Sequence, residues 1–231
     1  MLGPLGHWRL FTVLLAVAAV WLLRAWILHA VAWGLIVDEN RTGADYLWIA
    51  GGDHCYDQAA QLYHDQPSRR IVLVEQYPRR IVRAGVQLSP EAIGRRELAR
   101  RGVPPEAVIV IPGRAKNAWE ATRILGEWRP SRAGAEVLLL CDRFDSRRRR
   151  RIQDSALDAD SAKHIHVLAL PDRRFDESDW WRTRDGVKHC GLSWLWLTYA
   201  WCRGAPDEPV ENWNPDDYEQ TLRQMLKEAA R

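Results

Sequence analysis

Five short apolar runs alternate with helical patterns over most of this chain. Each run is rich in Val, Ile or Leu and is bounded by polar or turn-forming residues, as expected for buried strands. The runs are Tyr46–Ala50, Ile71–Val74, Ala107–Ile111, Glu136–Leu140 and His164–Leu168. The intervening helical patterns are Tyr56–His64, Pro90–Arg101, Asn117–Trp128 and Ser146–Ala156. This alternation predicts an α/β fold, a Rossmann-like three-layer α/β/α domain with a parallel sheet.

A long apolar segment precedes the first strand. Residues 10–37 are nearly free of charge, with only Arg24 and His29 as interruptions, and this length exceeds the roughly 20 residues that cross a bilayer as a helix. We therefore expect one N-terminal transmembrane helix after a short tail of residues 1–9. The alternative is a cleaved signal peptide with its core at Leu10–Leu23 and a small-x-small site at Ala30–Ala32. The apolar residues that continue beyond Arg24 favour an uncleaved anchor.

The flanking charges predict the orientation of this anchor. Arg9 and the terminal amine precede it, whereas Asp38 and Glu39 follow it, so the charge bias favours a cytoplasmic N-terminus. We expect a single-pass membrane protein with residues 41–204 as one α/β domain outside the cytoplasm. Residues 205–231 are expected to form an acidic linker and then an amphipathic helix, capped by Asn214 with Pro215 in its first turn.

Charge and cysteine spacing argue against nucleic-acid binding and against a metal site. The formal net charge is only +3, and the run Arg147–Arg151 winds around a helix, so these five arginines cannot all face one groove of a nucleic acid. We expect no nucleic-acid partner. The four cysteines show no C-x-x-C spacing, and His164 and His166 have no third ligand nearby in sequence, so no metal site is predicted. A disulfide between Cys190 and Cys202 and free buried thiols both remain open.

The candidate site lies where three of the strands end. Glycines and polar residues follow the first, third and fourth strands, and in a doubly wound sheet these loops meet at the carboxyl edge. The candidate ligand-binding residues are Gly51, Gly52, Asp53, Asn117, Glu120, Asp142, Asp145 and Arg148. The helix N-termini at Asn117 and near Ser146 are expected to hold an anion, and Arg148 to point toward it.

Structural roles account for several of these residues equally well. Asn117 and Glu120 have the spacing of a capping box. Asp53 and Asp145 suit the starts of helices. The two glycines can simply turn the chain.

Taken together, several segments resemble the YdcF-like family, which includes SanA and ElyC and carries domain of unknown function 218. They are the strand followed by Gly51-Gly52, the A-x-x-L-Y piece Ala59–Tyr63, Gly102-Val-Pro before a strand, Glu120-Ala121, the Phe144–Arg148 segment, and Trp180–Arg182 with Gly186. The resemblance spans about residues 45–204. It implies a membrane segment joined to an envelope-facing Rossmann-like domain, with a role in cell-envelope or peptidoglycan-related processes and no agreed reaction.

The chain departs from this family at polar positions. Cys55 or a neighbour stands where the family has Arg, Val74–Gln76 replaces a second glycine pair, and Asn117 replaces Thr. The family's Thr-Ser-x-x-His motif reads Cys141-Asp142 and ends at Asp145 here. The added carboxylates weaken phosphate binding and suit a cationic group or a divalent metal instead.

Two hypotheses follow, and neither names a cofactor. The first is an envelope enzyme or former enzyme that acts on a phosphate- or nucleotide-bearing small molecule, such as an envelope precursor. The second is a non-catalytic scaffold with a degenerate pocket. The missing His favours the second, because no other residue of that loop shuttles protons near neutral pH.

Overall fold

A parallel five-stranded sheet forms the centre of the protein. The computed structural model describes residues 4–39, 41, 43–128, 135–204, 225, 227 and 228. The strands are β1 (Tyr46–Ile49), β2 (Arg70–Gln76), β3 (Val108–Ala115), β4 (Val137–Asp142) and β5 (Ile165–Leu170). They lie in the order β3-β2-β1-β4-β5 and all pair in parallel, which confirms the predicted Rossmann-like α/β class. The strand order reverses between β1 and β4, and ligands bind at such switch points.

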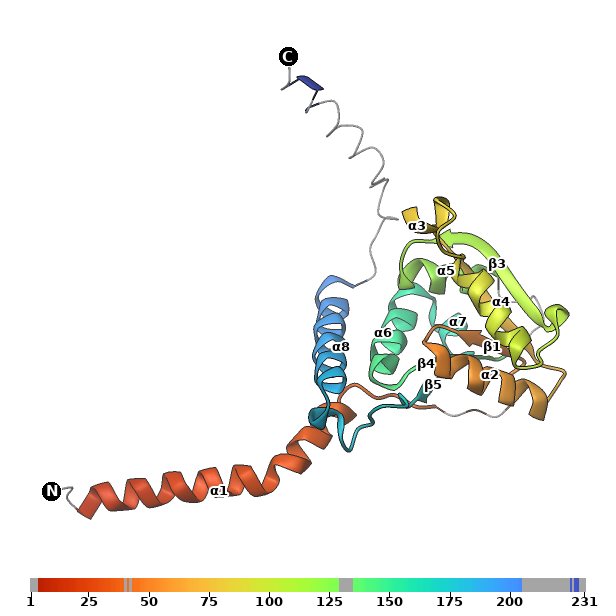
Figure 1. Ribbon diagram of the computed structural model, residues 1–231. Helices are drawn as coiled ribbons and strands as arrows, with labels where there is room; N and C mark the ends of the chain where they lie inside the picture. Colours follow the sequence, from red (N-terminus) through yellow and green to blue (C-terminus); the bar gives the residue numbers. More distant parts are fainter. Residues whose placement is uncertain are drawn as a thin grey trace.

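Helices cover both faces of the sheet (Figure 1). They include α2 (Asp53–Asp65), α4 (Pro90–Arg100), α5 (Ala118–Trp128) and α6 (Ser146–Ala156), together with the single-turn helices α3 (Arg80–Arg83) and α7 (Ala159–Ala162). Successive β4 residues point to opposite faces of the sheet, and both faces are apolar. Leu138 and Leu140 pack beneath α2 and α4, whereas Val137 and Leu139 pack on the side of α5.

A further long helix, α8 (Arg184–Arg203), packs outside α6 and was not predicted from the sequence. Its buried side chains include Cys190, Leu197 and Ala200. A short 3₁₀ turn, η3 (Trp180–Arg182), leads into it, and η1 (Pro105–Ala107) and η2 (Arg143–Asp145) precede β3 and α6.

The N-terminal helix α1 (Pro4–Trp33) extends away from the domain, and its last turns pack on α8 (Figure 1). Trp180 and Trp194 donate their indole N–H groups to the carbonyls of Leu28 and Val31, each at 3.2 Å. Within the described residues, no helix taken singly has the length and hydropathy of a membrane span. The two halves of α1, Phe11–Trp21 and Leu23–Trp33, pass that test only as a pair, with a bend of 52° between them.

The remaining expectations concern the C-terminus and the cysteines. The expected acidic linker and amphipathic helix of residues 205–231 lie outside the described residues, except for Met225, Lys227 and Glu228, which are helical. All four cysteines are free, and Cys190 is buried whereas Cys202 is exposed. Of the two alternatives for this pair, the structure therefore has free thiols.

Candidate functional site

A cavity of about 270 Å³ opens over the carboxyl ends of β1 and β2. Residues of both strands form its floor, and the first turns of α4 and α5 and the side of α6 complete its wall. The lining residues are Trp48, Ile49, Ala50, Gly51, Tyr56, Leu73, Val74, Gln76, Pro90, Glu91, Asn117, Ala118, Ala121 and Arg149. Apolar side chains and converging polar groups share this wall, and polar groups that converge on a concave apolar site are typical of small-molecule binding.

Arg149 is the cationic residue of this cavity. Its Nε donates to Asp145 at 2.9 Å and its Nη2 donates to the carbonyl of Ala50 at 3.0 Å. These two bonds fix the guanidinium beside the Gly51 loop. Its third nitrogen, Nη1, has no hydrogen-bond partner among the residues that the structure describes.

Arg148 does not point into the cavity, which corrects the sequence expectation. Its guanidinium forms a bidentate pair with Asp145, with Nη2 at 2.7 Å from Oδ2. Burial alone raises the pKa of Asp145, but the charges and hydrogen bonds of Arg149 and Arg148 outweigh burial and hold this pKa below its ordinary value. Asp145 therefore orients two arginines and is not exposed to a ligand.

The helix N-termini at the cavity are those of α4 and α5. Asn117 Oδ1 accepts from the Glu120 N–H at 2.9 Å, and Glu120 in turn accepts from the Lys116 N–H at 2.7 Å, so the structural capping role is real. Asn117 also lines the cavity, so it has both roles. Glu120 is not a lining residue.

The N-terminus of α6, expected to bind the anion, is occupied by the chain that follows α1. The Ser146 hydroxyl accepts from the Val37 N–H at 2.9 Å, and the Arg147 N–H donates to the Leu35 carbonyl at 3.0 Å. Ser146 is fully buried. Neither Ser146 nor Arg147 lines the cavity, so the expected anion at this helix end has no support from the cavity and stays a prediction.

Gly51 and Gly52 bring β1 against the end of β4. A Cβ on Gly51 would lie 2.4 Å from Cys55 Sγ and 3.1 Å from the Asp142 nitrogen, so this position has no room for a side chain. The Gly52 N–H points to Asp142 Oδ1 at 3.4 Å. Asp53 is exposed in the first turn of α2, and no described carboxylate joins it in a cluster.

Beside these glycines, His54 and Asp142 form a pair that sequence reasoning missed. His54 Nε2 lies 3.1 Å from Asp142 Oδ1. The Asp142 carboxylate raises the pKa of His54, although burial opposes the shift. The sequence did hold a signal for this pair, because His54 directly follows Gly51-Gly52-Asp53. It was missed because the helix was expected to begin only at Tyr56, whereas α2 begins at Asp53.

The two cysteines here are poor nucleophiles. Cys55 and Cys141 are fully buried, and desolvation raises the pKa of each thiol above its ordinary value. Each thiol is therefore protonated at neutral pH unless a metal displaces the proton.

Comparison with known proteins adds no relative. No model of a protein family matches the chain, and no curated protein matches it.

Proposed function

We propose that this chain is a membrane-anchored, YdcF-like protein that binds a phosphate- or nucleotide-bearing small molecule at the carboxyl edge of its sheet, with a role in cell-envelope biogenesis. The observation that carries the proposal is the cavity of about 270 Å³, into which Arg149 and the first turns of α4 and α5 converge.

Three features of the cavity suit an anion. The helices α4 and α5 each span 11 residues and direct the positive ends of their dipoles toward it. Arg149 adds a cation that is already positioned by Asp145 and Ala50. A preorganised guanidinium loses little entropy when it binds a phosphate oxygen.

The rest of the lining defines what else the ligand carries. Trp48, Ile49 and Leu73 form an apolar wall that suits a base or the carbon skeleton of a sugar. Glu91 Oε2 is buried and lacks a hydrogen-bond partner among the described residues. A hydroxyl or amino group on the ligand would satisfy this oxygen, so the cavity favours an anion with hydrogen-bond donors over bare phosphate.

The anchor is supported by exposed apolar side chains along α1. Phe11, Trp21 and Trp26 are 64%, 62% and 77% exposed, and apolar residues continue along this helix. Exposed apolar surface of this extent suits lipid. We propose that α1 lies in a bilayer as a single-pass anchor and that the domain lies outside the cytoplasm. In cells, a reporter fused to the C-terminus that is active only outside the cytoplasm would support this orientation, and activity only inside would reverse it.

Ligand binding is tested with the full chain in detergent micelles, by thermal unfolding with inorganic phosphate, uridine monophosphate and adenosine monophosphate. We expect a nucleotide to raise the unfolding temperature more than phosphate does. Asn117→Asp keeps an N-cap residue but places a carboxylate at the anion, so it should weaken nucleotide binding about tenfold or more.

Asn117→Ser is the matched control, because serine also caps the helix without adding charge. Glu91→Gln should act in the opposite direction and strengthen binding of the phosphate group. If no probe stabilises the folded wild-type chain, the binding proposal fails.

The alternative is a non-catalytic envelope scaffold with a degenerate pocket. It is favoured by Asp145, which neutralises Arg148 and Arg149, and by the protonated thiols of Cys55 and Cys141. Under this alternative the ligand probes have no effect, and alanine at Asp53 and Asp145 changes nothing in cells beyond the loss of stability.

A further inference from the structure

Three side chains with different donor atoms meet at the switch point between β1 and β4. His54 and Cys55 come from the first turn of α2, and Asp142 ends β4. One imidazole nitrogen, the thiol sulfur and one carboxylate oxygen all lie within 4.8 Å of one another. The cluster is separate from the nucleotide cavity, which none of these three residues lines.

The spacing is close to that of ligands around one metal ion. A tetrahedral zinc site with ordinary bond lengths separates its ligand atoms by about 3.3–3.7 Å. His54 Nε2 and Asp142 Oδ1 are already 3.1 Å apart. A displacement of about 1 Å in the Cys55 sulfur brings the third atom into range, which a small rotation of one side chain supplies.

The state of His54 distinguishes this cluster from ordinary core packing. A buried cysteine alone needs no further explanation. Here, however, His54 Nε2 is shielded from solvent and has no well-aligned hydrogen-bond partner among the described residues, although a carboxylate oxygen lies beside it. An imidazole nitrogen and a carboxylate that share a metal ion take up this arrangement without needing a hydrogen bond.

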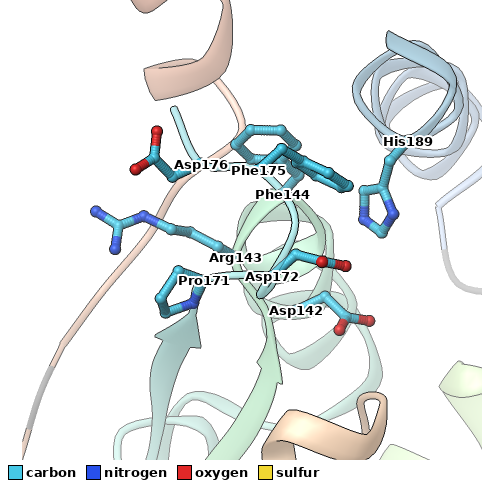
Figure 2. Close-up of a pocket in the computed structure, with 8 residues that line it drawn as sticks. All are labelled: Asp142, Arg143, Phe144, Pro171, Asp172, Phe175, Asp176 and His189. Atoms are coloured by element: carbon cyan, nitrogen blue, oxygen red, sulfur yellow. The ribbon is translucent and has the colours of Figure 1, made fainter. Parts of the chain in front are cut away.

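A small cavity lies on the other side of Asp142. Its volume is about 10 Å³, roughly that of one water molecule, and Asp172 and His189 also line it. Figure 2 shows the carboxylates of Asp142 and Asp172 and the ring of His189 on the same side of this pocket. It offers a position for a water molecule next to Asp142, the one residue of the cluster that lines it.

We propose that His54 Nε2, Cys55 Sγ and Asp142 Oδ1 bind a divalent transition metal, with Zn²⁺ the best match, and that water takes the fourth position. Nitrogen, sulfur and oxygen donors together suit zinc, whereas Mg²⁺ and Ca²⁺ require oxygen donors alone. Three protein ligands with one open position is the arrangement of catalytic zinc sites, not of structural ones. On binding, the Cys55 thiol gives its proton to solvent and its sulfur bonds to the metal.

Cobalt titration tests the proposal directly, because Co²⁺ substitutes for Zn²⁺ and reports its ligands by absorption. The probe is Co²⁺ added to the full-length, tag-free chain in detergent after treatment with a chelator. We expect one equivalent of Co²⁺ to give intense visible bands of tetrahedral cobalt and a near-ultraviolet band from thiolate-to-cobalt charge transfer. One equivalent of Zn²⁺ should displace it.

The variants identify the ligands. Cys55→Ser should abolish the charge-transfer band, and His54→Gln and Asp142→Asn should each weaken Co²⁺ binding at least about tenfold. Cys202→Ser is the matched control, because this cysteine is exposed and lies outside the cluster, and it should leave the spectrum unchanged. Circular dichroism without metal checks that each variant folds.

Two results would overturn the metal site. One is a weak octahedral spectrum without a charge-transfer band in the wild-type chain. The other is a band that survives in Cys55→Ser. If that variant does not fold, unchanged affinity in His54→Gln alone rejects the site. Neither result bears on nucleotide binding, because the probes and the variants differ.

Discussion

Of the five consecutive arginines, Arg149 is the one that lines the cavity. The Asp145 carboxylate binds Arg148 and Arg149 together, and only Arg149 continues to the Ala50 carbonyl and the cavity. Adjacent residues on a helix differ by about 100° in direction, so a shift of one position changes which side chain lies at the site. The sequence indicated an arginine here, but the choice between neighbours depends on where α6 begins and how it is rotated.

Removing the Asp145 charge should destabilise the protein in a pH-dependent way. We expect Asp145→Asn to cost about 3 kcal/mol at neutral pH, because two partly buried guanidinium groups lose their partner. The native pKa of Asp145 lies below that of the unfolded chain. The stabilisation is therefore fully present above about pH 4 and is lost as the pH falls through the native pKa, so the difference from wild type should shrink in acid.

Urea unfolding at several pH values, followed by circular dichroism, measures this effect. Asp154→Asn is the control, because Asp154 pairs with Arg150 on the same helix but is 43% exposed and should change stability by less than about 1 kcal/mol. A loss of stability in Asp145→Asn that did not vary with pH would contradict the electrostatic explanation.

At the same scale, some site residues were readable from the sequence and others were not. Gly51 and Asn117 line the cavity and could be placed at this sheet edge from the sequence, because glycine pairs after a strand and capping residues have local signatures. His54 and Glu91 were missed because their roles arise from contacts with other elements. Only the strand order places β4 beside β1, and with it Asp142 beside His54.

Among the elements, α8 is the one whose sequence pattern was least informative. The strands were predicted because β-branched and leucine-rich runs between turn residues have few other interpretations. In α8, apolar residues lie on both faces, so the usual helical stripe is absent. One face packs on the domain through Leu197 and Ala200, and the other exposes Leu192, Leu195, Trp196 and Tyr199.

The helix α1 extends away from the domain on the side of α8 that is remote from α6 (Figure 1). Trp180 in η3 and Trp194 in α8 both donate hydrogen bonds to α1 and hold it against this part of the domain. If α1 enters a bilayer as proposed, α8 lies along the membrane surface, where tryptophan and tyrosine rings are favoured. We therefore expect the exposed face of α8 to contact lipid.

Labelling in vesicles tests this contact. In the full chain with Cys202→Ser, Leu195→Cys carrying a polarity-sensitive fluorophore should shift to shorter wavelength and be quenched by lipids that bear a quencher, because the label enters the interface. The vesicles contain phosphatidylcholine and phosphatidylglycerol. Arg96→Cys on α4 is the exposed control and should show neither effect. Equal, water-like emission at both positions would reject the contact.

For the whole molecule, the segment after α1 determines how this helix is joined to the domain. It runs along the outer edge of β5, where the Glu39 N–H donates to the Val167 carbonyl at 2.8 Å and the Glu39 carboxylate accepts from the Val167 N–H at 3.1 Å. Arg150 also pairs with Glu39 at 3.2 Å. This segment covers a sheet edge that would otherwise offer free backbone groups for pairing with another chain.

The α/β class and the five strands could be predicted, because each strand carries its own apolar signal. This edge segment could not, because Asp38 and Glu39 follow a long apolar run and look like ordinary residues after a membrane helix. The role of this segment depends on its contacts with Val167, Arg150 and the Ser146 hydroxyl, all of which are distant in sequence.

Loosening this segment should expose it to protease without unfolding the sheet. Glu39→Ala removes the acceptor for Val167 and the partner of Arg150, and Ser146→Ala removes the hydroxyl that binds Val37 and Leu35. Each lost contact is worth about 1 kcal/mol, so the double variant should raise the population of the open segment roughly tenfold or more. Limited digestion with trypsin reads this population through cleavage at the exposed Arg41, and the cleavage rate should rise by the same factor. Glu127→Ala, an exposed position on α5, should leave the rate unchanged. Because the sheet contacts are untouched, the cleaved domain should keep its thermal transition. Equal cleavage rates in the wild type and the double variant would show that these bonds do not hold the segment.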